Sequence, residues 1–303
     1  MSVLKSPLSK ALKIALIQLS AGSDKAANLT KVTRLIDDAI TNSTIGALDL
    51  VMLPECFNSR YAVDQFRNYA EVIPSGETTQ LLSQLSKKHG VFIVGGSIPE
   101  LAPEEDNKIY NTSLTFDPNG KIIAKHRKVH LFDIDIPNGI TFKESTTLSP
   151  GSKATVFKLG EFGTVGLGIC YDIRFPELAQ IASRSPHNSF AMFYPGAFNT
   201  TTGPLHWNLL ARSRAVDNEV FTVLCSPARD VAGGGYQAYG HSLVCDPFGK
   251  IIAEAGEGEE ILYAELDEKL LPQARSSIPV HYQRKFDVYE DFVGKGNAKV
   301  SDV

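Results

Sequence analysis

The sequence predicts an α/β protein in which two similar halves pack as a four-layer α-β-β-α sandwich. Two observations favour this class. Short apolar runs with strand character alternate with longer helical patterns, as in proteins that stack helices on sheets. Several segments of the first half also recur, in the same order, in the second half. Two such units can pack sheet against sheet, which buries on each sheet the face that its own helices leave uncovered.

The elements of the first half follow from their apolar patterns. Four runs are short, apolar or rich in β-branched residues, and bounded by turn residues: 14–19, 50–53, 91–94 and 111–116. Residues 28–40 carry apolar side chains on one helical face, which predicts a helix after the first strand. Residues 78–89 predict a second helix, and Gly90 ends it because glycine readily takes the left-handed conformation found at helix ends.

The second half repeats this order. Four pairs of segments correspond: 13–19 with 164–170, 50–54 with 191–195, 91–94 with 220–223, and 117–124 with 246–253. The last two pairs lie at one common spacing, and both copies of the last pair begin with an Asp-Pro-x-Gly turn. Such turns also occur in unrelated hairpins, so the shared order and spacing carry the argument. We expect the functional residues to lie where the strand ends of the two halves meet.

We expect one domain over residues 12–290 and a C-terminal tail over residues 291–303. A chain of 303 residues allows one large domain or two ordinary ones, and the similarity of the halves favours one. Residues 271–303 are charged and aromatic without a strand signal. This last segment is therefore expected to wrap around the body or around a partner subunit.

The composition excludes several classes of protein. Hydrophobic residues make up 43% of the chain and charged residues 21%, and the net charge of -4 offers no basic surface for nucleic acid. No apolar run reaches the length of a membrane span. The four cysteines form no C-x-x-C pair, so we expect free thiols in a reducing compartment. This favours a cytoplasmic location. Residues 1–13 contain lysines and no acidic residue, so mitochondrial targeting stays open as an alternative.

Three apolar runs each end on a reactive side chain, namely Glu55, Lys128 and Cys170. A carboxylate, an ammonium and a thiol are the parts of a general base, an electrophilic clamp and a nucleophile. Cys170 follows a strand and precedes a tight turn, with Pro176 opening a helix. A nucleophile at such a turn is expected to be exposed, with the next backbone N–H free to bind an oxyanion.

Each of these residues also has an ordinary structural reading. Cys170 could be a small core hydrophobe, Glu55 a capping or ion-paired carboxylate, and Lys128 part of a solvated strand edge. Burial after an apolar strand would instead raise the pKa of Glu55 toward that of a base, and strand alternation puts Lys128 on the face of His126. The spacing of His126 and His130 could bind zinc on a helix, but the preceding hairpin makes this segment a strand or a loop, so we expect no metal.

Together, three segments resemble the nitrilase (carbon-nitrogen hydrolase) superfamily: Leu53-Pro54-Glu55, residues 126–131 and residues 168–177. The resemblance extends over about residues 13–289 and implies that Cys170 is the nucleophile and Glu55 the general base. It further implies that Lys128 stabilises the tetrahedral oxyanion and that Glu144 is the second glutamate that positions substrate. The family implies no metal and no organic cofactor, and a homodimer.

Within the superfamily, the chain resembles the ω-amidase branch through residues 131–137, 194–199, 202–207 and 226–230. This implies hydrolysis of the terminal amide of 2-oxoglutaramate and 2-oxosuccinamate to the keto dicarboxylic acid and ammonia. The deaminated glutathione amidase shares the triad and several of these motifs, so it stays an alternative. A true nitrilase, a non-catalytic binding protein of the same fold, and a redox sensor that uses Cys56, Cys225 or Cys245 stay open as well.

Arg174 and Tyr171 are the predicted substrate-binding residues. A dicarboxylate-derived amide carries a carboxylate away from its reacting end, and Arg174, four residues past the nucleophile, offers a bidentate fork at about that distance. Alternatively, Arg174 pairs with Asp172 or Glu177 and only shapes the turn. The backbone N–H of Tyr171 is the expected oxyanion donor.

Overall fold

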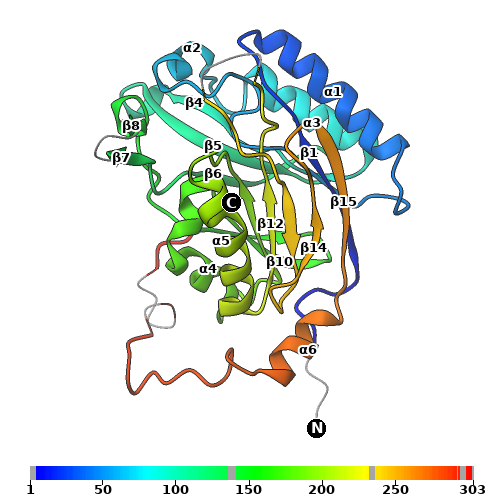
Figure 1. Ribbon diagram of the computed structural model, residues 1–303. Helices are drawn as coiled ribbons and strands as arrows, with labels where there is room; N and C mark the ends of the chain where they lie inside the picture. The colour runs from blue at the N-terminus through cyan, green and yellow to red at the C-terminus, as the bar shows by residue number, and fades with distance from the viewer. Residues whose placement is uncertain (1–4, 136–140, 232–235, 292, 294–297, 302–303) are drawn as a thin grey trace.

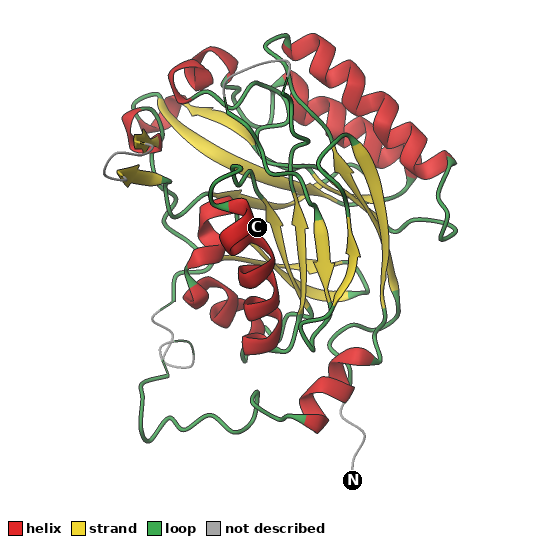
Figure 2. Ribbon diagram, viewed as in Figure 1, coloured by secondary structure: helices red, strands yellow, loops and turns green. Residues whose placement is uncertain are grey.

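The computed structural model describes residues 5–135, 141–231, 236–291, 293 and 298–301. Two β-sheets face each other, and helices cover the outer side of each sheet (Figures 1 and 2). The helices of the first half lie on one side of the molecule and those of the second half on the other.

The first sheet contains the strands of the first half together with one late strand. Its order is β15-β1-β2-β3-β5-β4, and β6 also pairs with β5. β1 is parallel to β2 and β2 to β3, while β15 is antiparallel to β1. The strands are β1 (Leu12–Gln18), β2 (Leu50–Met52), β3 (Phe92–Val94), β4 (Ile98–Ala102), β5 (Lys108–Phe116), β6 (Ile122–Arg127) and β15 (Glu260–Leu266).

The second sheet repeats this arrangement in the order β14-β13-β12-β11-β10-β9. Again three central strands are parallel, and an antiparallel strand flanks the first of them. The strands are β9 (Thr155–Leu159), β10 (Gly163–Leu167), β11 (Ala191–Pro195), β12 (Phe221–Cys225), β13 (Leu243–Cys245) and β14 (Ile251–Glu254). The predicted correspondence of 13–19 with 164–170, and of the two hairpins, is therefore confirmed. β4 has no counterpart among these strands and was not predicted.

The helices begin and end for local reasons. Asp24 caps α1 (Lys25–Thr41) by accepting from the backbone N–H of Ala27 at 3.0 Å. Gly90 ends α3 (Glu77–His89) with φ of 66°, as predicted. The second half contributes α4 (Pro176–Ser183), with its proline in the first turn, and α5 (Gly203–Asn218). The remaining helices are α2 (Phe66–Tyr69), α6 (Leu270–Ser277), η1 (Val63–Gln65), η2 (Pro103–Glu105), η3 (Glu144–Thr146) and η4 (Cys170–Arg174).

Three apolar cores separate four layers. The central core joins inward side chains of both sheets, such as Leu16 and Met52 with Leu167 and Phe193. A second core lies between the first sheet and helices α1 and α3, and a third between the second sheet and helices α4 and α5. The predicted α-β-β-α sandwich is confirmed. Among the described residues, no helix is long and apolar enough to cross a membrane.

Two peripheral segments complete the chain. A small hairpin, β7 (Asp133–Asp135) and β8 (Thr141–Lys143), projects from the first half; residues 136 and 137 of the family segment 131–137 lie outside the described residues. After α6, which the sequence did not predict, the chain passes the end of α5 (Figure 1): the backbone N–H of His281 donates to Glu219 at 3.0 Å, and Arg284 donates to the backbone carbonyl of Asp217 at 2.9 Å. Further on, Val300 pairs with Ala154 just before β9. The segment after α6 therefore contacts the body of its own chain at both of these places.

Candidate active site

The three predicted catalytic side chains meet between the sheets. Glu55 follows β2, Lys128 follows β6 directly, and Cys170 begins η4 after β10. The Lys128 ammonium donates to Glu55 Oε1 at 3.0 Å and to Glu144 Oε1 at 2.9 Å. All three of these charged side chains are fully buried. Segments from both halves thus bring one cation between two carboxylates beside the thiol.

Cys170 lies at a sharp turn between strand and helix. Its φ of 47° is in the left-handed region, an unfavourable conformation for a residue with a β-carbon. Asp172 holds the turn by accepting from the backbone N–H of Ile169 at 2.9 Å. The expected exposure of the nucleophile is wrong, since only 6% of Cys170 is exposed. The loop after β11 covers it, and the backbone N–H of Ala197 in that loop donates to Cys170 Sγ at 3.4 Å.

Burial sets the protonation of the thiol and its base. It raises the pKa of the Cys170 thiol well above its ordinary value; the Glu55 charge adds to this effect, while Lys128 opposes it. Burial likewise raises the pKa of Glu55, although Lys128 lowers it. Burial alone would lower the pKa of Lys128, but Glu144 and Glu55 raise it well above its ordinary value. Burial and the Glu55 charge therefore favour the neutral form of the thiol.

Glu144 contacts protein groups with both oxygens. Oε1 accepts from Lys128 and from the Tyr61 hydroxyl at 2.5 Å, and Oε2 accepts from the backbone N–H of Phe132 at 2.7 Å. These contacts make Glu144 a partner of Lys128. The sequence did not single out Tyr61, because a tyrosine in a loop carries no distinctive signal.

Asn111 is a further residue that the sequence analysis did not identify. It lies on β5, is buried, and donates from Nδ2 to Glu55 Oε1 at 2.9 Å. Its amide side chain within a predicted strand is the signal that could have marked it. Glu55 Oε2 is buried and has no hydrogen-bond partner among the described residues, so this oxygen stays available to accept a proton.

Asp172 connects the Cys170 turn with β6 and with the residues that follow it, which include Lys128. Its carboxylate accepts from His126 Nε2 at 2.9 Å, from His130 Nδ1 at 2.8 Å and from the His130 backbone N–H at 2.9 Å. Burial would raise the pKa of Asp172, but these hydrogen bonds hold it well below the ordinary aspartate value. His126 Nδ1 bonds Thr155 at 2.9 Å, so both of its ring nitrogens have protein partners. Both histidines therefore bond the Asp172 carboxylate and hold the Cys170 turn in place.

Arg174 has hydrogen-bond donors that the described protein groups do not occupy. Its guanidinium lies over the rings of Phe198 and Tyr171, with the central carbon 4.7 and 5.6 Å from their centroids. One terminal nitrogen is 3.1 Å from His206 Nδ1, while the enclosed Nε has no partner among the described residues. Burial lowers the pKa of Arg174. No ion pair of Arg174 occurs in the described part of the chain, so the alternative pairing with Asp172 or Glu177 is wrong.

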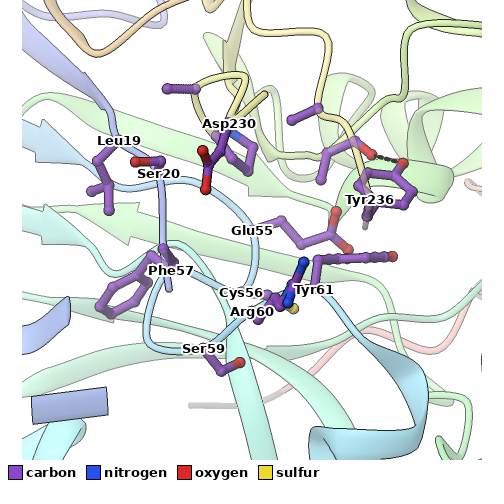
Figure 3. Close-up of a pocket in the computed structure, with 15 residues that line it drawn as sticks. Leu19, Ser20, Glu55, Cys56, Phe57, Ser59, Arg60, Tyr61, Asp230 and Tyr236 are labelled. Atoms are coloured by element: carbon purple, nitrogen blue, oxygen red, sulfur yellow. Dashed lines mark hydrogen bonds between the residues drawn. The ribbon is translucent and has the colours of Figure 1, made fainter. Parts of the chain in front are cut away.

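Two cavities that share Tyr61 and Tyr236 lie near this cluster. The inner chamber has a volume of about 50 Å³ and lies beside Glu55, lined by Ala197, Ala228, Tyr61 and Tyr236 among others (Figure 3). The outer vestibule has a volume of about 700 Å³ and is lined by residues of the β7–β8 hairpin, of η1 and of the loop after β11. Aromatic rings crowd the border between the two cavities. A small substrate could therefore approach the cluster from the vestibule.

Comparison with known proteins supports a family assignment. The sequence profile described as carbon-nitrogen hydrolase matches residues 13–276. The omega-amidase NIT3 of Saccharomyces cerevisiae is 57% identical over 288 residues, which cover 94% of this chain and 97% of that protein. The omega-amidase NIT2 of Homo sapiens is 49% identical over 277 residues, which cover 91% of this chain and 96% of that protein.

Comparison with solved structures identifies the same family. The crystal structure of S. cerevisiae Nit3, described as a member of branch 10 of the nitrilase superfamily, matches with a TM-score of 0.84 and 52% identity, covering 93% of this chain and 99% of that one. The match of the family profile and the high identity over almost the whole length confirm the predicted resemblance. The chain belongs to the carbon-nitrogen hydrolase family.

Proposed function

We propose that this protein is an ω-amidase that hydrolyses the terminal amide of 2-oxoglutaramate and 2-oxosuccinamate through a cysteine thioester. The observation that carries the proposal is the buried contact of Lys128 with Glu55 and Glu144 beside Cys170. The names of the yeast and human relatives, at 57% and 49% identity, support the same substrate class. Because the chemistry needs only a nucleophile, a base and an oxyanion site, we propose that it proceeds without a cofactor.

The first half-reaction forms the thioester. Because burial favours the neutral form of the Cys170 thiol, Glu55 removes its proton as the sulfur attacks the amide carbon. Lys128, held charged between two carboxylates, and the Tyr171 backbone N–H stabilise the oxyanion. When the tetrahedral intermediate collapses, Glu55 gives its proton to the leaving nitrogen, and the C–N bond breaks to release ammonia.

The second half-reaction returns the free enzyme. Glu55 takes a proton from water, whose oxygen attacks the thioester carbon. Lys128 again stabilises the oxyanion, the C–S bond breaks, and Glu55 returns the proton to the sulfur. The keto dicarboxylic acid then leaves. Glu144 acts in both steps through Lys128, because both of its oxygens are bonded to protein groups.

Arg174 is the proposed clamp for the distant carboxylate of the substrate, with Tyr171 packed against it. Its partly buried guanidinium keeps an unpaired Nε, and a carboxylate would satisfy donors that the described protein groups leave open. Replacement of Arg174 by Ala should raise KM for keto-acid amides far more than for simple aliphatic amides. An equal loss on both kinds of substrate would remove this role.

The decisive test of the activity is ammonia release. The parent protein should release ammonia from 2-oxoglutaramate at neutral pH, and Cys170→Ala should release none while its circular dichroism and melting temperature match those of the parent. Deaminated glutathione, offered to the same preparation, separates the ω-amidase from the alternative amidase. A folded parent protein that hydrolyses neither amide would favour a non-catalytic binding role.

We also propose a homodimer that forms through α5. Leu205, Leu209 and Val216 lie on one face of this helix and are 64%, 59% and 48% exposed. Apolar residues gathered on one helical face usually mark an interface. Light scattering should give twice the chain mass for the parent and the single-chain mass for Leu209→Glu.

The location of the protein and the bounds of its domain stay as predicted from the sequence: we propose a cytoplasmic protein with one domain over residues 12–290.

A further inference from the structure

Two tyrosines stand between the chamber and the vestibule. Tyr61, in the loop before η1, and Tyr236, on the far side of the site, both line both cavities. Their ring centroids are 4.6 Å apart, and Figure 3 shows the Glu55 carboxylate pointing toward the two rings. A molecule in the vestibule and a molecule in the chamber would therefore be on opposite sides of this pair.

Both rings are fixed by polar and aromatic contacts. The Tyr61 hydroxyl donates to Glu144 at 2.5 Å, and its ring stacks on Phe142 with centroids 5.9 Å apart. The Tyr236 hydroxyl donates to the backbone carbonyl of Ala197. The N–H of that same Ala197 residue donates to Cys170 Sγ. The pair is thus tied to both the lysine cluster and the nucleophile, so it forms part of the site and not a loose surface lid.

The chamber is suited to very small molecules. A cavity with a volume of about 10–15 Å³ already holds one water molecule. The chamber, with about 50 Å³, therefore has room for a few atoms but not for a keto-acid chain. Its lining includes Glu55, whose buried Oε2 has no partner among the described residues. It also includes Ala197, which contacts the sulfur. A water in the chamber therefore lies beside the base and beside the residue whose backbone N–H bonds the sulfur.

We propose that the chamber holds the nucleophile of the second half-reaction, that the acyl chain lies on the other side of Tyr61 and Tyr236, between Arg174 and the vestibule, and that the two tyrosines form the partition. The proposal rests on the thioester chemistry of the proposed function. Water in the chamber gives one proton to Glu55, and its oxygen bonds to the thioester carbon. The C–S bond breaks, the sulfur regains the proton from Glu55, and the second proton of the water leaves with the acid product.

The experiment measures which nucleophiles intercept the thioester. Methoxyamine and O-benzylhydroxylamine carry the same reactive nitrogen and differ mainly in size. The parent protein, turning over any amide that it accepts, should transfer its acyl group to methoxyamine and at least about tenfold less to O-benzylhydroxylamine. The readout is the ratio of acyl-transfer product to acid product, which does not depend on the fraction of active protein.

Two pairs of variants locate the size limit. Ala228→Val narrows the chamber and should lower the methoxyamine ratio about tenfold, whereas Ala62→Val, the same change in the vestibule, should leave the ratio at the parent value. Tyr236→Ala removes a ring of the partition and should admit O-benzylhydroxylamine. Tyr236→Phe keeps the ring without the hydroxyl and should still exclude it.

The outcomes separate this proposal from the proposed function. If the parent transfers to both reagents equally, or if Ala62→Val changes the ratio as much as Ala228→Val, then the chamber is not the nucleophile site. Should Ala228→Val fold poorly, the two Tyr236 variants decide the question alone. Absence of ammonia from 2-oxoglutaramate, while simple amides still form hydroxamate esters, would overturn the keto-acid substrate and leave the chamber intact.

Discussion

Two buried carboxylates on either side of the site, Glu55 and Asp172, have opposite properties. Asp172 has hydrogen-bond partners on both oxygens, from two histidines and two backbone N–H groups, and its pKa is lowered. Among the described residues, Glu55 has hydrogen-bond partners on Oε1 only, and burial raises its pKa. Burial is the same for both residues, so the partners determine the difference. A fully bonded carboxylate holds the fold, and an incompletely bonded one can exchange a proton.

The largest expected effect is on catalysis at Glu55. Glu55→Gln removes the proposed base, so kcat/KM should fall about 10³-fold, within the usual range for a general base, with a melting temperature no lower than that of the parent. Ammonia release by a known concentration of folded protein measures this effect. Comparable rates in the variant and the parent would mean that another group moves the proton.

The second effect is on stability at Asp172. Asp172→Asn leaves buried donors of His126 and His130 with a weaker partner, so the free energy of unfolding should fall by about 3 kcal/mol. Urea unfolding of this variant beside Glu55→Gln gives the contrast directly. Equal losses of stability in the two variants would contradict the distinction between a structural and a reactive carboxylate.

The pH dependence should have opposite signs at the two residues. The lowered pKa of Asp172 stabilises the fold above the unfolded value of about 3.9, and this stability is lost as the pH falls below it. The raised pKa of Glu55 instead costs stability as the pH rises above about 4.3, the unfolded glutamate value. From pH 7 to pH 3, the stability gap between the parent and Asp172→Asn should narrow by about 1 kcal/mol.

This prediction is checked by urea unfolding at several pH values. Relative to the parent, Glu55→Gln should gain stability at neutral pH and lose that advantage toward pH 4. Parallel curves for all three proteins would show that neither carboxylate titrates differently in the folded and unfolded states.

The smallest effect is expected at Tyr61. Tyr61→Phe removes one hydrogen bond to Glu144 but keeps the ring, so kcat should fall about tenfold with KM little changed. Tyr69→Phe, which removes a hydroxyl bonded to the backbone of Ser23 at the surface, is the matched control and should match the parent. A loss at Tyr61 that falls on KM alone would point to substrate contact rather than to support of Lys128.

The sequence predicted the sandwich because periodic patterns and the internal repeat are local or nearly local signals. It also predicted that Glu55, Lys128 and Cys170 meet, because the strand ends of the two paired halves converge. It could not predict the contacts of Asp172 with His126 and His130, because no pattern in the sequence marks these side chains as partners. The enclosure of Cys170 was missed as well, because the covering residue, Ala197, comes from a loop with no pattern of its own.

The raised pKa of the Cys170 thiol has a practical consequence for chemical labelling. General alkylating reagents such as iodoacetamide react with thiolates, so a neutral, enclosed sulfur should label slowly. A proteomic survey that ranks cysteines by such labelling would therefore place this residue among the inert ones. Carbonyl electrophiles that develop a negative oxygen next to Lys128 are the better probes, because they trigger proton transfer to Glu55 as they bind.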